Sequence, residues 1–137
     1  MELTDTAYQK AIEVLKHCAK KTGFYASGLP GGYEATWARD SMISSLGVAA
    51  AAQPRANSRK RFGTGVTDNK LKTAFRKSIE LLAKNQSQRG QIPNAVGSYN
   101  TERRSDVTFN SIDSTLWWII GLHTYSKAYK DQSILKK

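Results

Sequence analysis

The chain has 137 residues, with 21 lysine and arginine residues against 11 aspartate and glutamate residues, and its net charge is +10. This length fits one small domain with a core, or part of a larger domain, and the basic excess raises nucleic acid or an anionic surface as a partner. An internal disulfide is excluded, because Cys18 is the one cysteine. With no signal-peptide pattern and no apolar run of roughly 18 residues, the sequence predicts a cytoplasmic protein without membrane contact.

The first expected helix covers residues 5–21 and is amphipathic. Its apolar side chains recur every three or four residues, opposite a row of lysines, as on a surface helix that packs by one face. Gly23 is expected to end this helix, and residues 24–36 are expected to form a loop that contains several turns. The predicted stripe consists of Ala7, Ala11, Ile12, Leu15, Cys18 and Ala19.

The second expected helix covers residues 41–53 and contains no charged residue. Pro54 ends it, and a helix that is apolar or small all round is a buried helix. The following segment, "PRANSRKRFGTGV" at residues 54–66, is basic and contains glycine. It is predicted to be a surface loop.

Two further helices are expected, at residues 68–85 and 111–129. Between them lies a segment, residues 86–109, that is long for a loop of a compact domain, and such loops are usually functional or flexible. From residue 114 to residue 126 the last helix has no charged lysine, arginine, aspartate or glutamate, which predicts a second buried helix. The helix at 68–85 is amphipathic, and its predicted stripe is Leu71, Ala74, Phe75, Ile79 and Leu82.

The helices thus alternate between amphipathic and buried types, which indicates an all-α fold built from two αα-hairpins. Two hairpins cannot surround both inner helices. Residues 1–137 are therefore predicted to be a single partial domain, which belongs to a larger helical barrel or assembles with a second chain.

A tryptophan, an arginine and an aspartate come together where the second helix begins, at Trp37, Arg39 and Asp40. Asp113 lies at the corresponding end of the last helix. Each aspartate could serve as an N-cap, and each tryptophan could pack in the core. The combination also suits a sugar, which presents an apolar ring face to an aromatic side chain and hydroxyls to charged groups. If the hairpins are parallel, Asp40 and Asp113 open onto one pocket.

Three segments, "TWARDSMI", "GQIPNAV" and "NSIDSTLWWIIGLHTYSK", occur in this order. They resemble consecutive motifs of the six-hairpin glycosidases, and above all the glucosidase domain of glycogen-debranching enzymes, amylo-α-1,6-glucosidase. Glucoamylases and neutral invertases carry similar motifs. The resemblance covers roughly residues 20–128. It implies the first part of an (α/α)6 barrel and an enzyme family that hydrolyses α-glucans with inversion.

The resemblance also implies roles for individual residues. Arg39 and Asp40 would hold hydroxyls of the terminal sugar, and Trp37 would line the same subsite. Asn94 and Asp113 would lie at its rim or behind it. The candidate substrate-binding residues are Trp37, Arg39, Asp40, Asn94, Asp113 and Trp117.

No catalytic residue is assigned. Inverting hydrolysis needs a general acid and a general base roughly 6.5–9.5 Å apart, and in the resembled glycosidases both follow the leucine–tryptophan helix. We therefore expect both to lie outside this chain, which would be inactive alone. Asp40 is not taken as the acid, because pairing with the adjacent Arg39 would favour the ionised carboxylate. No residue cluster has metal-ligand spacing, and no cofactor is expected.

Other functions stay open at this point. A neutral-invertase-like fragment would share the motifs, and a remnant could bind sugar without chemistry. A basic helical module could bind nucleic acid, although its aromatic residues lie on buried helices and not among the basic ones. That basic face would consist of Arg55, Arg59, Lys60, Arg61, Lys72, Arg76 and Lys77.

Overall fold

The computed structural model describes residues 3–31, 33–52, 68–98 and 105–136. The predicted basic loop at 54–66 lies outside the described residues. Most of the described chain is helical, as expected, and is consistent with part of an α/α domain. The helices are α1 (Leu3–Cys18), α2 (Ala38–Ala52), α3 (Asn69–Lys84), α4 (Ser114–Tyr129) and the short 3-10 helix η1 (Gln132–Lys136).

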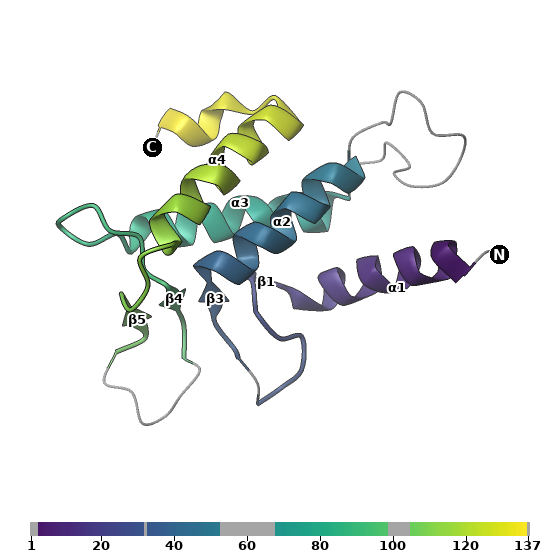
Figure 1. Cartoon of the computed structure of the whole chain (residues 1–137), viewed down its shortest axis with the longest axis horizontal. Helices are drawn as coiled ribbons and strands as arrows, with labels where there is room; N and C mark the ends of the chain where they lie inside the picture. Colours follow the sequence, from purple (N-terminus) through teal and green to yellow (C-terminus); the bar gives the residue numbers. More distant parts are fainter. Residues whose placement is uncertain (1–2, 32, 53–67, 99–104, 137) are drawn as a thin grey trace.

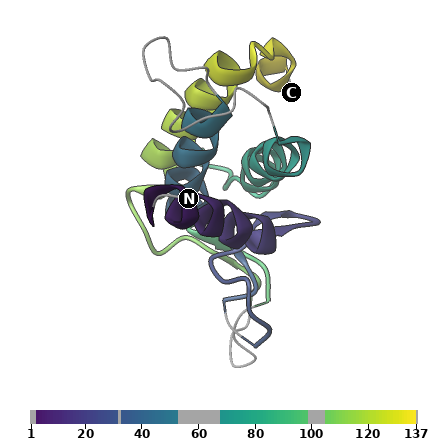
Figure 2. The same ribbon diagram turned by 90° about the vertical axis from the view of Figure 1, so that its right-hand side faces the viewer.

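The helices α2 and α4 run side by side, with their N-terminal ends at the same end of the molecule (Figure 1). A Cβ atom on Gly121 of α4 would overlap the thioether of Met42 on α2, so glycine allows this close approach. The helix α3 packs against both of them, on the side seen best in Figure 2. The helices α2 and α4 therefore both pack on α3, and α1 packs against this core through a few side chains only.

The helix α3 supplies the centre of the core, and the predicted stripe is confirmed. All five of its residues are at most 2 % exposed, and the Phe75 ring meets the Tyr125 ring edge-on, with 5.3 Å between the ring centroids. The helix begins after Asp68, whose carboxylate accepts hydrogen bonds from the backbone N–H groups of Lys70 and Leu71. This N-cap satisfies two amides that the helix itself leaves unpaired.

In the described part of the chain α2 and α4 are buried only in part, which agrees with the prediction that two hairpins cannot surround both inner helices. Ile43 on α2 is 45 % exposed, and on α4 the exposed fractions of Leu116 and Ile119 are 62 % and 53 %. Each helix buries the face that meets its partner and α3, and each leaves an apolar face open. Apolar side chains on a second face are typical of a helix that has further neighbours.

The helix α1 is amphipathic, but its stripe is only partly buried. Ile12, Leu15 and Cys18 are half-buried and pack on the core, whereas Ala7 and Ala11 are exposed. The free Cys18 thiol is half-buried, and burial raises its pKa.

Short strands interrupt the predicted all-α fold. The chain leaves α1 at Cys18 because β1 (Ala19–Lys20) pairs with β2 (Gly23–Phe24). Gly23 is therefore a strand residue and not a helix cap. Its φ is +137°, and a Cβ atom there would lie 2.9 Å from the Ser78 backbone. The Phe24 N–H donates to the Ser78 hydroxyl at 2.8 Å, which attaches this hairpin to α3.

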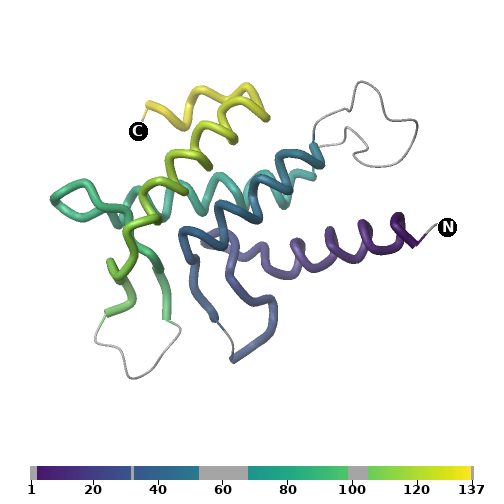
Figure 3. The backbone as a smooth tube through the Cα atoms, viewed as in Figure 1, coloured from purple at the N-terminus to yellow at the C-terminus, as the bar shows by residue number. Residues whose placement is uncertain are grey.

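A second, three-stranded sheet joins segments that are distant in sequence. β4 (Ala95–Val96) pairs on one side with β3 (Thr36–Trp37) and on the other with β5 (Val107–Thr108), and both pairs are antiparallel. Figure 3 shows that the chain continues from β3 into α2 and from β5 toward α4. Strands of two residues have no hydrophobic period, so the sequence pattern could not predict them.

Candidate functional site

The three-stranded sheet holds the first turn of α2 against the segment that contains Asn94. Trp37 pairs with Ala95, and the Ala38 N–H donates to the Asn94 carbonyl at 2.9 Å. The Asn94 N–H in turn donates to the Thr108 carbonyl at 2.8 Å. These bonds place the "WARD" and "IPN" motifs next to each other.

The Asn94 side chain fixes the approach to α4. Its Oδ1 atom accepts a hydrogen bond from the Asn110 N–H at 2.8 Å. The Ile92 N–H donates to the Thr115 hydroxyl at 3.1 Å, which attaches the same loop to the first turn of α4. Asn94 therefore acts as a positioning residue, and its expected place at the rim of the site remains a prediction.

Arg39 and Asp113 connect the N-terminal ends of α2 and α4. The Arg39 Nη1 atom lies 3.5 Å from the Asp113 Oδ2 atom, and the two side chains are 59 % and 34 % exposed. This contact confirms that the two helix ends lie side by side and face the same way. An ion pair this long and this exposed is weak, so it leaves both groups available to a ligand.

Asp113 is the N-cap residue of α4 by position, but its side chain makes no cap hydrogen bond. The Ser111 hydroxyl donates to Oδ1 of Asp113 instead. This hydrogen bond, followed by the nearby Arg39 charge, lowers the pKa of Asp113. Asp113 is thus ionised at neutral pH and is suited to accepting hydrogen bonds.

The expected pairing of Arg39 with the adjacent Asp40 is corrected by the structure. The helix α2 begins at Ala38 and not at Ser41, so Arg39 and Asp40 both lie inside its first turn. Neighbours in a helix point about 100° apart and do not face each other. Arg39 can therefore reach across to Asp113, and Asp40 is a first-turn residue and not the N-cap.

Arg39 and Asp40 line a cavity of about 290 Å³ between α1, β2 and α2. Asp113 is not among its lining residues, so Arg39 lies between this cavity and the Asp113 carboxylate. That Asp40 and Asp113 open onto one common pocket stays a prediction. The cavity is lined by Val14, Leu15, Cys18, Phe24, Tyr25, Ala26, Arg39, Asp40, Ile43 and Ser44.

The two candidate tryptophans have different surroundings. The Trp37 ring contacts the exposed Tyr33 ring edge-on, with 5.7 Å between the ring centroids. Two aromatic side chains therefore lie together at the start of α2. Trp117 is half-buried and packs against the core one turn after Asp113, as the packing interpretation predicted. Sequence reasoning missed Tyr33 and Ser111. The tyrosine at 33 sits in a glycine-rich turn, and Ser111 stands two residues before an aspartate that it can bond.

Two residues of the predicted basic face, Arg76 and Lys72, already have partners in the described part of the chain. Arg76 pairs with Glu80 at 3.0 Å and with Asp131 at 2.8 Å. The Lys72 ammonium lies over the Tyr129 ring, 5.2 Å from its centroid. Lys77 is exposed, and the remaining basic residues of that face, Arg55, Arg59, Lys60 and Arg61, lie outside the described residues.

Across the described ranges no group of three or more histidine, cysteine, aspartate or glutamate side chains could hold a metal ion. None of the helices in these ranges is both long and apolar enough to span a bilayer.

A protein-family model described as amylo-alpha-1,6-glucosidase matches residues 9–137 of the chain. No curated protein and no solved structure matched the chain. The match covers nearly the whole sequence and includes all three motifs and the contact between Arg39 and Asp113. The chain belongs to the amylo-α-1,6-glucosidase family, a family of glycoside hydrolases that act on α-glucans.

Proposed function

We propose that this chain contributes the sugar-binding residues of an α-glucan hydrolase, and that a terminal glucose unit binds where α2 and α4 begin. The observation that carries the proposal is the contact between Arg39 and Asp113, 3.5 Å apart at the two adjacent helix ends. It supports a binding role because a guanidinium and a carboxylate are the groups that hold neighbouring sugar hydroxyls.

The weakness of this ion pair suits exchange with a ligand. Arg39 has five N–H donors and is 59 % exposed, so hydroxyls can reach it without breaking a buried interaction. A hydroxyl between Arg39 and Asp113 would accept from one and donate to the other. Trp37, with Tyr33 beside it, would cover the apolar face of the ring, and Asp40 would bind from the cavity side.

The proposal assigns binding and not proton transfer to Asp113. The lowered pKa of its carboxyl group is the wrong direction for a general acid at neutral pH. In an inverting hydrolase the two catalytic carboxylates stand roughly 6.5–9.5 Å apart on opposite sides of the scissile bond. We assign neither role to a described residue, and we propose that the isolated 137-residue chain releases no glucose from a limit dextrin.

The same proposal includes the larger architecture. The exposed faces of α2 and α4, at Ile43, Leu116 and Ile119, are where further helices of an (α/α)6 barrel would pack, from this or a second chain. A cytoplasmic location belongs to the proposal and rests on the sequence expectation.

The test is a titration of the folded chain with maltotriose, in which isothermal calorimetry and NMR measure binding. Arg39→Ala and Asp113→Asn should each weaken binding about 10- to 100-fold, because a hydrogen bond to a charged group is worth about 1.5–3 kcal/mol. The matched control is Arg89→Ala, which removes an exposed arginine from a loop far along the chain. Circular dichroism checks that each variant keeps its helices.

Two other ligands test the alternatives. Binding of sucrose without binding of maltotriose would favour the invertase-like interpretation. Retention on heparin that falls steeply with salt, together with no glucan binding, would favour the nucleic-acid interpretation. Maltotriose binding that survives both Arg39→Ala and Asp113→Asn would overturn the proposed site.

A further inference from the structure

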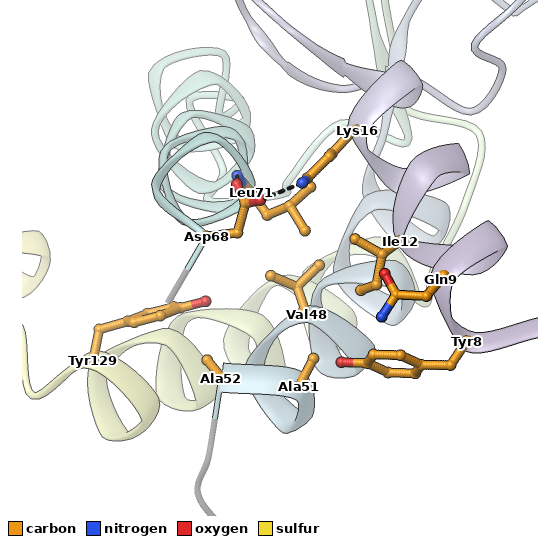
Figure 4. A pocket seen from close by; sticks show the side chains of 10 residues that line it. All are labelled: Tyr8, Gln9, Ile12, Lys16, Val48, Ala51, Ala52, Asp68, Leu71 and Tyr129. Atoms are coloured by element: carbon orange, nitrogen blue, oxygen red, sulfur yellow. Dashed lines mark hydrogen bonds and ion pairs between the residues drawn. The ribbon is translucent and has the colours of Figure 1, made fainter. Parts of the chain in front are cut away.

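A second cavity lies at the opposite end of α2 from Arg39. It has a volume of about 220 Å³ and is enclosed by α1, α2, the start of α3 and the end of α4 (Figure 4). Val48, near the C-terminal end of α2, lies on its wall. It is nine residues beyond Arg39, which corresponds to roughly 14 Å along the helix axis at about 1.5 Å per residue. The two cavities are therefore separate places on one helix.

Neutral hydrogen-bonding groups converge on this cavity from several elements. In Figure 4 the Tyr8 hydroxyl from α1 and the Tyr129 hydroxyl from α4 point toward each other from opposite sides, and the Gln9 amide lies on the α1 side, above the Tyr8 ring. Burial raises the pKa of Tyr129 to about 12, so its hydroxyl keeps its proton at neutral pH. Each hydroxyl can both donate and accept.

The charges on the wall are balanced. Lys16 and Asp68 form an ion pair at 2.8 Å, with side chains that are 44 % and 30 % exposed. A paired lysine and aspartate leave no net charge to attract an anion or a cation. They do offer one donor and one acceptor, side by side, to a ligand that has neighbouring hydroxyl groups.

The rest of the wall is apolar and small. Val48 and Ala51 of α2 lie between the two tyrosine side chains in Figure 4, Ala52 also lines the cavity, and Ile12 lies on the side next to α1. A ligand that fits needs one apolar face, several hydroxyls and no charge. A pyranose ring has these features. The volume is below the roughly 300–1,000 Å³ of pockets for drug-sized ligands, so the cavity suits a single ring and not a chain.

We propose that this cavity is a second sugar site, which binds one glucose unit of the α-glucan independently of the site at Arg39. The identity of the ligand rests on the proposed function. Tyr8, Gln9 and Tyr129 would contact the hydroxyls, and the Lys16–Asp68 pair would orient the ring. Two sites on one rigid helix would hold a branched glucan by two of its chain ends, and such linked binding raises the affinity for a polymer over that for a short sugar.

The experiment is an NMR titration of the isotope-labelled chain with maltose and, separately, with glycogen. With the wild-type chain, the amide signals of Ala51 and Ala52 should shift with a dissociation constant of their own, distinct from that of the Arg39 and Asp40 signals. This mapping needs no variant, so the folding of a mutant cannot decide it.

Variants then separate the two sites. The double variant Tyr8→Phe with Gln9→Ala removes a hydroxyl and an amide while keeping the ring and the helix, and it should weaken maltose binding at Ala51 and Ala52 at least tenfold. Binding at Arg39 should stay unchanged. Gln88→Ala, at an exposed loop glutamine, is the control and should leave both sites unaltered. Glycogen affinity should fall more than maltose affinity in the double variant, because one of two linked contacts is lost.

The outcomes distinguish this inference from the proposed function. Shifts at Arg39 without shifts at Ala51 and Ala52 would overturn the second site and leave the proposed function standing. Shifts at Ala51 and Ala52 that persist in Arg39→Ala support the second site, whether or not the first site binds. An absence of shifts at both places, with maltose and with glycogen, overturns both.

Discussion

Gly121 on α4 faces the Met42 side chain on α2, and a Cβ atom at position 121 would overlap the Met42 sulfur. The two inner helices thus meet through a glycine and a flexible thioether. Gly121→Ala should destabilise the chain by about 1–3 kcal/mol, the usual cost of overpacking a core. Urea unfolding followed by circular dichroism measures this change in the free energy of unfolding.

Gly47 provides the matched control on α2, because a Cβ atom there meets nothing within 4 Å. Gly47→Ala should stabilise the chain by about 0.5–1 kcal/mol through its higher helix propensity. Combining Gly121→Ala with Met42→Ala should cost less than the sum of the two single changes, since the smaller side chain makes room. Strict additivity would contradict the contact.

Gly23 should be the least replaceable glycine of the chain's N-terminal half. Gly23→Ala would combine a left-handed φ of +137° with a Cβ atom 2.9 Å from the Ser78 backbone. We expect a loss on the order of 3 kcal/mol, from overpacking and backbone strain together. Gly31→Ala is the comparison, because Gly31 also has a positive φ, of +73°, but has open space around it. An equal loss for both variants would show that the close approach to α3 does not matter.

Asp68 combines an N-cap with an ion pair, and two variants separate these roles. Asp68→Ala should cost about 1 kcal/mol of stability through the lost cap. Asp68→Asn keeps a capping oxygen and loses only the charge opposite Lys16, which lies 2.8 Å away. Thermal melts of the two variants at neutral pH should therefore place Asn between Ala and the wild type.

The same carboxyl group predicts a pH dependence of stability. The Lys16 hydrogen bond lowers the pKa of Asp68 in the folded chain. Its stabilising contribution is therefore fully present above the ordinary aspartate pKa of about 3.9 and is lost as the pH falls through the lowered folded value. Asp68→Asn should flatten the loss of stability below about pH 4. If the free energy of unfolding, measured with urea, falls below pH 4 in the same way for Asp68→Asn and the wild type, Asp68 makes no such contribution.

Ser111 should control the acid limit of sugar binding. Its hydroxyl donates to Asp113 and is the largest cause of that residue's lowered pKa. In Ser111→Ala the pKa of Asp113 rises toward its usual range, so the carboxylate takes up a proton earlier as the pH falls. Acidification should therefore abolish maltotriose binding at a higher pH in this variant than in the wild type. Ser111→Thr keeps the hydroxyl and should restore the wild-type profile. Calorimetric titrations at several pH values read out the shift, and identical profiles for Ala and Thr would count against it.

The sequence predicted α3 almost completely, because its stripe of large apolar residues is opposed by lysines and its start is marked by Asp68. It did not predict where α2 begins. The strand at Thr36–Trp37 is held by residues near position 95, and no local pattern encodes such pairing. The alternation of amphipathic and buried helices predicted that the N-terminal ends of α2 and α4 lie side by side. It did not predict that Arg39 pairs with Asp113, because Asp113 lies 74 residues away in sequence.

The antiparallel pairing of Thr36 with Val96 also has a consequence for how the molecule reaches its native state. Helices form from local contacts within about a microsecond, whereas a ladder between segments so distant in sequence must first close a long loop against its entropy. The helical circular dichroism signal should therefore recover early during refolding. Competence to bind a sugar at Arg39 should return later, when the ladder that seats the first turn of α2 has closed.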